Sequence, residues 1–89
     1  MSLEQTEQII NNYIANILEN GSDDVLFASS YLQGHLDLIL QGCFQAQQNF
    51  EQFMQLMEQS LAGAYAKNEL SQQDRLLVEN CWQELKVLF

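Results

Sequence analysis

The sequence has no proline, three basic residues, one histidine and two cysteines among its 89 residues. Without proline, no residue is present that breaks a helix from within. Three cations cannot neutralise the row of phosphates that a nucleic acid presents, so we expect no nucleic-acid partner. The same shortage disfavours docking onto an anionic membrane, and no apolar stretch reaches the ~18 residues of a spanning helix. A small acidic domain remains, with a formal net charge of −9 and 47% hydrophobic residues.

The compartment is indicated by the N-terminus and the cysteines. Residues 1–8 are polar and acidic, without the basic and apolar regions of a secretory signal. Cys43 and Cys81 lie far apart in the chain, which favours reduced, buried thiols over a disulfide. We therefore expect a cytoplasmic protein of bacterial type. The length predicts a single domain over residues 1–89 with one modest core.

Apolar residues recur at helical spacing in four segments, which predicts an all-α fold. The expected helices span about residues 3–20, 23–44, 49–67 and 72–89. Short links favour antiparallel neighbours, and therefore an up-down-up-down four-helix bundle. Gly21 suits the left-handed residue that often follows a helix. Gly42 leaves one boundary open, because it either lies inside the second helix or ends it.

Two of the helix starts are marked by residues that cap helices. Ser22 precedes Asp23 and Asp24, so its hydroxyl can accept from free backbone N–H groups while the aspartates lie at the positive end of the helix dipole. Ser71, with Asp74 three residues later, marks the fourth helix in the same way. We interpret both serines as caps. The alternative for Asp23 or Asp24 is that it binds a cationic group of a partner.

Two stretches of the chain have an unusual sequence. Residues 22–36 read SDDVLFASSYLQGHL, and residues 68–74 read NELSQQD, followed by Leu77, Val78 and Trp82. In order and spacing they resemble the signature of the YfcL family, and they cover about a third of the chain. The resemblance implies a small helical protein of the bacterial cytosol. It implies no particular activity.

The first of these stretches places Asp24, Tyr31 and His35 near one face of the second helix. This suggests a small polar site in which His35 acts as an acid, a base or a ligand and Tyr31 as a hydrogen-bond donor. The alternative is a buried histidine whose ring is hydrogen-bonded to a neighbouring helix. Asp24 lies about 16 Å from His35 along a continuous helix, so the two cannot touch. We therefore predict no catalytic residue.

Metal and cofactor sites are not expected. His35 has no glutamate three residues away, as carboxylate-bridged helical bundles require. His35 and Cys43 are about 12 Å apart along one helix and cannot bind one tetrahedral ion. Phosphate-binding loops and dinucleotide fingerprints are absent.

Apolar and small residues raise the question of a partner. Gly34 and Gly42 share a face with Leu38, and each costs about 1 kcal/mol in a helix relative to alanine. The close approach of another helix, within the bundle or across a dimer interface, would offset that cost. The apolar end of the chain, residues 86–89, likewise needs cover from the bundle or from another chain. The apolar face that includes Phe53 and Met57 is either core or a partner surface.

The leading hypothesis is a non-enzymatic interaction protein that binds an unknown protein partner or itself. Its candidate binding or motif residues are Asp23, Asp24, Phe27, Tyr31, Gly34 and His35. A second hypothesis is a small-ligand or catalytic site around Tyr31 and His35. A third is an acidic mimic of a nucleic acid. Seven glutamates are spread over three of the predicted helices, which favours ordinary solubility over mimicry; they are Glu4, Glu7, Glu19, Glu51, Glu58, Glu79 and Glu84.

Overall fold

The computed structural model describes residues 1–89 and contains four α-helices and no strand. The helices are α1 (Leu3–Asn20), α2 (Asp23–Gln45), α3 (Phe50–Ala66) and α4 (Gln72–Leu88). These bounds differ from the expected ones by one residue at most. The predicted all-α fold with four bundled helices is confirmed. None of the helices combines the length and the hydropathy that crossing a bilayer requires.

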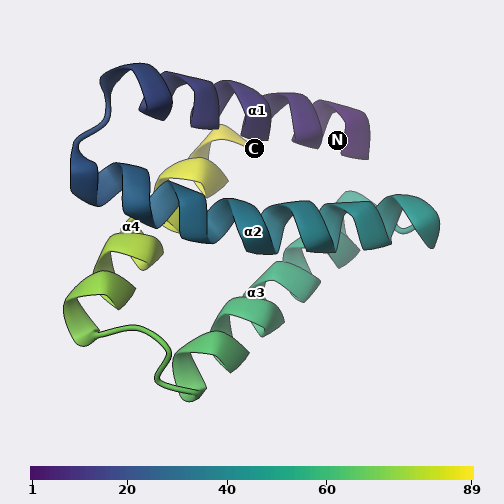
Figure 1. Ribbon diagram of the computed structural model, residues 1–89. Coiled ribbons are helices and arrows are strands. Elements are labelled where there is room, and N and C mark those ends of the chain that lie inside the picture. Colours follow the sequence, from purple (N-terminus) through teal and green to yellow (C-terminus); the bar gives the residue numbers. More distant parts are fainter.

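Helix α2 is the central element of the bundle. It packs against each of the other three helices, whereas α3 and α4 approach each other at few points. In Figure 1, α1 and α2 lie side by side, α3 runs obliquely away from α2, and α4 passes behind α2 so that the C-terminus lies near α1. Because α3 and α4 are held together mainly through α2, the space between them is bridged by side chains rather than closed by backbone contact.

The helix starts are fixed by local hydrogen bonds. The hydroxyls of Ser22 and Ser71 accept from the backbone N–H three residues later, at 3.4 Å and 3.1 Å. Asn49 caps α3 and forms a reciprocal capping box with Gln52. These interactions satisfy backbone donors that the first turn of a helix leaves without partners, so a short stretch of sequence is enough to place each start.

The links differ from expectation at Gly21. This residue is extended, with φ −79° and ψ 152°, so the prediction of a left-handed residue was wrong. Glycine fits here for a steric reason instead, because the Cβ of any other residue would lie 2.7 Å from the carbonyl oxygen of Ile17. The left-handed residues are Gln47 and Asn68, with φ 55° and 54°.

The core lies where α2 faces the other helices, and its largest fully enclosed side chains are Phe53, Leu32, Leu36, Met57, Leu61, Leu85 and Val78. The apolar face of α3 is therefore core rather than a partner surface. At the end of α4, Phe89 packs on the core while Val87 and Leu88 are exposed, so the bundle covers only part of the apolar terminus. Cys43 and Cys81 are free and buried, as expected. Burial raises the pKa of both thiols.

Candidate functional site

Tyr31 and His35 lie one turn apart on α2, with their ring centroids 5.1 Å apart. The Nδ1 atom of His35 lies 2.7 Å from the Oγ atom of Ser60 on α3, and a hydrogen bond joins them. The Tyr31 hydroxyl donates to the carboxylate of Glu69, in the link between α3 and α4, at 3.1 Å. Burial and the bond to Glu69 raise the pKa of Tyr31. Both rings are half-buried, and each holds α2 to a different part of the chain.

The contact between His35 and Ser60 joins a base to a hydroxyl, but two components of a nucleophilic site are missing. The His35 ring makes no hydrogen bond to a third group that would orient it. Neither His35 nor Tyr31 lines any of the five best-formed pockets of the molecule, where a substrate would be expected to bind. The geometry favours the interpretation of a histidine that is hydrogen-bonded to a neighbouring helix.

The predicted aspartates lie apart from this pair. Asp23 and Asp24 are exposed at the start of α2, beside the Ser22 cap. Neither carboxylate makes a side-chain hydrogen bond or an ion pair within the chain. The structure therefore does not bring Asp24 to His35, and both aspartates lie where a negative charge stabilises the N-terminus of α2.

Another face of α2, which begins in the family-like stretch and continues beyond it, is turned mostly toward solvent. We call it the α2 outer face and define it as Phe27, Ser30, Tyr31, Gly34, Leu38, Gln41, Gly42 and Gln45. These residues follow one another at helical spacing, and none of them is charged. An added Cβ at Gly34 or at Gly42 would meet nothing within 4 Å. No helix of the same bundle therefore approaches these glycines, so the first of the two expected explanations was wrong. Helix α2 also continues through Gly42 to Gln45, so Gly42 does not end it.

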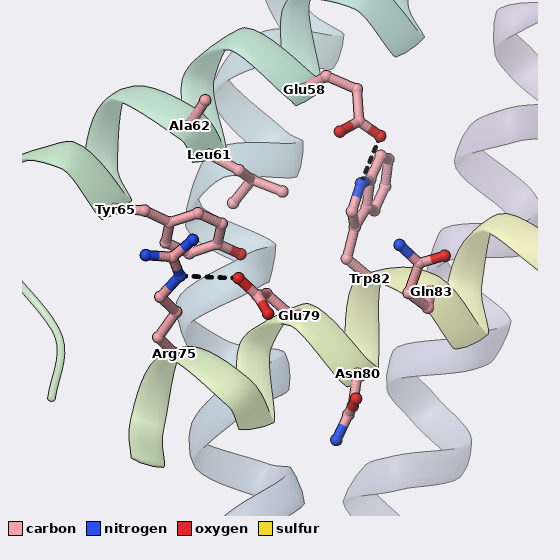
Figure 2. A pocket seen from close by; sticks show the side chains of 9 residues that line it. All are labelled: Glu58, Leu61, Ala62, Tyr65, Arg75, Glu79, Asn80, Trp82 and Gln83. Carbon is pink, nitrogen blue, oxygen red and sulfur yellow. Dashed lines mark hydrogen bonds and ion pairs between the residues drawn. The ribbon is translucent and has the colours of Figure 1, made fainter. Parts of the chain in front are cut away.

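A pocket of about 370 Å³ lies between α3 and α4, and the sequence did not indicate it. Figure 2 shows its lining, which consists of Glu58, Leu61, Ala62, Tyr65, Arg75, Glu79, Asn80, Trp82 and Gln83. We call it the α3–α4 groove. Its acidic residues come from both helices, and its floor is formed by Leu61 and Trp82, which are buried.

One side of the groove is organised around Glu58. The indole Nε1–H of Trp82 donates to Glu58 Oε1 at 2.8 Å, and the Lys86 ammonium donates to the same oxygen at 3.1 Å. Lys86 also lies over the Trp82 ring, 5.4 Å from its centroid. Partial burial alone would raise the pKa of Glu58, but these two hydrogen bonds and the Lys86 charge outweigh it and hold the pKa below its ordinary value.

The other side is organised around Tyr65. The Arg75 guanidinium lies over the Tyr65 ring, 4.6 Å from the centroid, and its Nε–H donates to Glu79 Oε1 at 2.7 Å. The Tyr65 hydroxyl is buried and has no hydrogen-bond partner. Burial and the nearby charge of Glu79 raise the pKa of Tyr65 to about 12. A buried phenol that neither donates nor accepts a hydrogen bond is an unusual feature of a protein interior.

Sequence reasoning missed the groove because each half looks ordinary by itself. Glu58 and Tyr65 lie two turns apart on α3, and Arg75, Glu79 and Trp82 follow at helical spacing on α4. Separately, the two rows are typical of solvated helix flanks. One signal was available, since two of the three cations in the chain are Arg75 and Lys86, both on α4. No group of three or more His, Cys, Asp or Glu side chains lies close enough together to hold a metal ion.

Comparison with known proteins places the chain among its relatives. The sequence model described as YfcL protein matches residues 4–87. The chain belongs to the YfcL family. Over 84 residues it is 34% identical to "Uncharacterized protein YfcL" of Escherichia coli (strain K12), an alignment that covers 93% of this chain and 91% of the relative. No solved structure matches the chain. The resemblance seen in residues 22–36 and 68–74 is thus confirmed, and membership of the family extends it over nearly the whole chain.

Proposed function

We propose that the protein is a non-enzymatic interaction module that binds a second copy of itself through the α2 outer face. The observation that carries this proposal is a strip of uncharged and mostly exposed residues, bordered by Asp23 and Asp37, in a chain of net charge −9. Leu38 at the middle of the strip is 71% exposed, and Phe27 near its start is 41% exposed. Apolar side chains held in water on an uncharged helix face are typical of surfaces that associate.

The arrangement of the strip favours a second copy as the occupant. Gly34 and Gly42 are equally spaced on either side of Leu38. When two α2 helices pair antiparallel about a twofold axis at Leu38, each Gly34 lies opposite Gly42 of the partner subunit. Both positions are open, so the two backbones can approach closely. Gly34 and Gly42, which lower the stability of α2 in the monomer, would then permit close contact between the two helices in the dimer.

Electrostatics gives this association a characteristic salt dependence. Two chains of charge −9 repel each other at long range, although no charged side chain lies within the strip itself. Added salt screens that repulsion, because the Debye length falls from about 10 Å at 0.1 M to about 3 Å at 1 M. Self-association should therefore strengthen with salt, whereas docking of a basic partner on the same face would weaken.

Sedimentation equilibrium at low and high salt tests the proposal. Leu38→Glu places a charge in the middle of the strip, and Leu18→Glu is the matched control, since Leu18 is 67% exposed but lies on α1. We expect a dimer that strengthens with salt, is lost in the Leu38 variant and persists in the Leu18 variant. A chain that stays monomeric up to about 1 mM, or equal loss in both variants, would contradict the proposal.

We also propose a cytoplasmic location, which the two free, buried thiols support. Reduced cysteines are the usual state in that compartment, and no other feature of the chain requires an oxidising one. Fractionation of cells that produce the tagged protein tests this location, with recovery in the membrane or periplasmic fraction as the contrary result.

A further inference from the structure

The α3–α4 groove uses residues that the α2 outer face does not. We propose that it binds an ammonium or guanidinium group carried on an aliphatic stem, and that Arg75 occupies this site in the free protein. The proposal does not depend on the pairing of α2 helices. It rests on three features of the groove, which are the free carboxylate oxygens, the Tyr65 hydroxyl and the apolar lining at Ala62 and Tyr65.

The carboxylates of the groove retain acceptor capacity. Glu58 accepts both of its hydrogen bonds through Oε1, and Glu79 accepts from Arg75 through Oε1 as well. The Oε2 atom of each makes no hydrogen bond within the chain. Two carboxylate oxygens that line one pocket, next to two aromatic faces, form a surface that attracts organic cations. Arg75 illustrates this chemistry within the molecule, since its guanidinium already contacts both the Tyr65 ring and Glu79.

The Tyr65 hydroxyl is an independent sign of a missing partner. It is buried without a hydrogen bond, and in Figure 2 it points toward the Glu79 carboxylate, with the Arg75 guanidinium beside its ring. A buried hydroxyl without a partner destabilises the fold. An incoming N–H group can donate to its oxygen. Because the hydroxyl is buried, a ligand reaches it only when neighbouring side chains move, and the Arg75 guanidinium over the Tyr65 ring is one that can.

Breaking the ion pair between Arg75 and Glu79 costs little free energy. The side chain of Arg75 is 50% exposed and that of Glu79 is 35% exposed. Exposed ion pairs one helical turn apart contribute little to stability, and Arg75 can swing into solvent on its flexible stem. The ligand cation then replaces the Arg75 guanidinium on Glu79 and gains the Tyr65 oxygen in addition.

The dimensions of the groove suit a side chain rather than a large cofactor. Its volume of about 370 Å³ lies at the lower end of the range of about 300–1,000 Å³ for ligand pockets. The exposed Ala62 and the half-buried Tyr65 ring line the groove and offer apolar surface to an aliphatic stem. The carboxamides of Asn80 and Gln83 line the same groove and are exposed, so they can hydrogen-bond to the peptide groups on either side of a basic residue.

The test uses Trp82 as a reporter, because it is the only tryptophan of the chain and its indole N–H bonds to Glu58. We would titrate the ¹⁵N-labelled protein with N-acetyl-arginine-N-methylamide, N-acetyl-lysine-N-methylamide and spermidine. N-acetyl-citrulline-N-methylamide is the neutral control. We expect a saturable shift of the indole resonance with the cations at about millimolar affinity and none with citrulline. Stronger binding of the amino-acid amides indicates a basic side chain as the natural ligand, and stronger binding of spermidine indicates a free polyamine.

Pairs of variants with the same change in net charge distinguish binding in the α3–α4 groove from non-specific attraction of cations to an acidic protein. Arg75→Ala should strengthen binding, because it removes the internal competitor, while Lys67→Ala makes the same change in net charge and should leave affinity unaltered. Glu79→Gln should weaken binding about tenfold, a loss of about 1.4 kcal/mol. Glu19→Gln, at the end of α1, should not. Equal effects within either matched pair would overturn the proposal.

Tyr65→Phe gives a result that a structural role would not produce. Removing a hydroxyl that lacks a partner should raise the melting temperature of the free protein and, at the same time, weaken binding of the arginine amide. A lowered melting temperature would mean that the hydroxyl is already satisfied in the free protein. An unchanged affinity would mean that the ligand does not use it. Either outcome would refute the role that we assign to Tyr65.

Discussion

Replacing Gly34 with alanine adds one methyl group to an exposed position of α2, where a Cβ would meet nothing within 4 Å. Alanine is favoured over glycine inside a helix by about 0.8–1.0 kcal/mol, because glycine loses more backbone entropy on folding. No steric term opposes this gain in the single chain. We therefore expect the free energy of unfolding to rise by nearly the full amount, and the melting temperature by about 4–8 °C for a domain of this size.

Gly42→Ala and Gly63→Ala provide replicates, since both positions are helical and equally open. Gly34 and Gly42 lie about 12 Å apart along α2, so their effects should add. Gly21→Ala should act in the opposite direction, because its Cβ would lie 2.7 Å from the Ile17 carbonyl oxygen and 2.9 Å from its Cγ2 atom. We expect that variant to lose about 1–3 kcal/mol of stability.

Urea denaturation at low micromolar concentration measures these stabilities while association is weak, and sedimentation equilibrium of the same variants measures self-association. If Gly34 and Gly42 permit two α2 helices to meet, alanine at either position should stabilise the monomer and weaken the dimer, whereas Gly63→Ala should only stabilise the monomer. A Gly34 variant that gains no stability would refute the inference that its surroundings are open. A Gly34 variant that gains stability and dimerises as before would refute the proposed contact.

Three further predictions concern the core, the His35 contact and the Glu58 site. Phe53→Ala should cost about 3–5 kcal/mol in urea denaturation, because Phe53 is fully enclosed. Ser60→Ala should cost about 0.5–1.5 kcal/mol, and the double variant with His35→Ala should cost less than the sum of the two single variants, since both disrupt the same hydrogen bond; additive costs would contradict this contact. The pKa of Glu58 is held below its ordinary value of 4.5, so its ionised form stabilises the fold at neutral pH, and this contribution is lost as the pH falls through the lowered pKa. Acid titrations followed by circular dichroism should therefore show a smaller loss of stability below pH 4.5 for Glu58→Gln than for the native chain, and identical profiles would contradict the assignment.

Much of the fold could be predicted because helices depend on neighbours in the sequence. A helical hydrophobic period and a capping residue act over a few positions, so Ser22 and Ser71 locate the starts of α2 and α4. Gly21 shows where such local reasoning ends. Its backbone follows from the path of the chain between α1 and α2 rather than from the general preference of glycine for left-handed conformations.

The candidate site was predictable only in part. The stretch that resembles the family was found from the sequence, and so was the common face of Tyr31 and His35, because residues on one helix keep a fixed geometry. The partner of His35 was not found, since Ser60 lies on another helix and nothing in the spacing along either helix pairs them.

The sequence by itself thus determined four amphipathic helices, their starts, the buried thiols and membership of the YfcL family. Only the tertiary structure decided which flanks meet. The oblique course of α3 and the crossing of α4 bring Glu58 to Trp82 and Tyr65 to Arg75, and they leave Gly34 facing solvent. The physical reason is that the hydrophobic effect is non-directional: it specifies that an apolar stripe is buried, while the crossing angles that shape a groove depend on side-chain packing among all four helices.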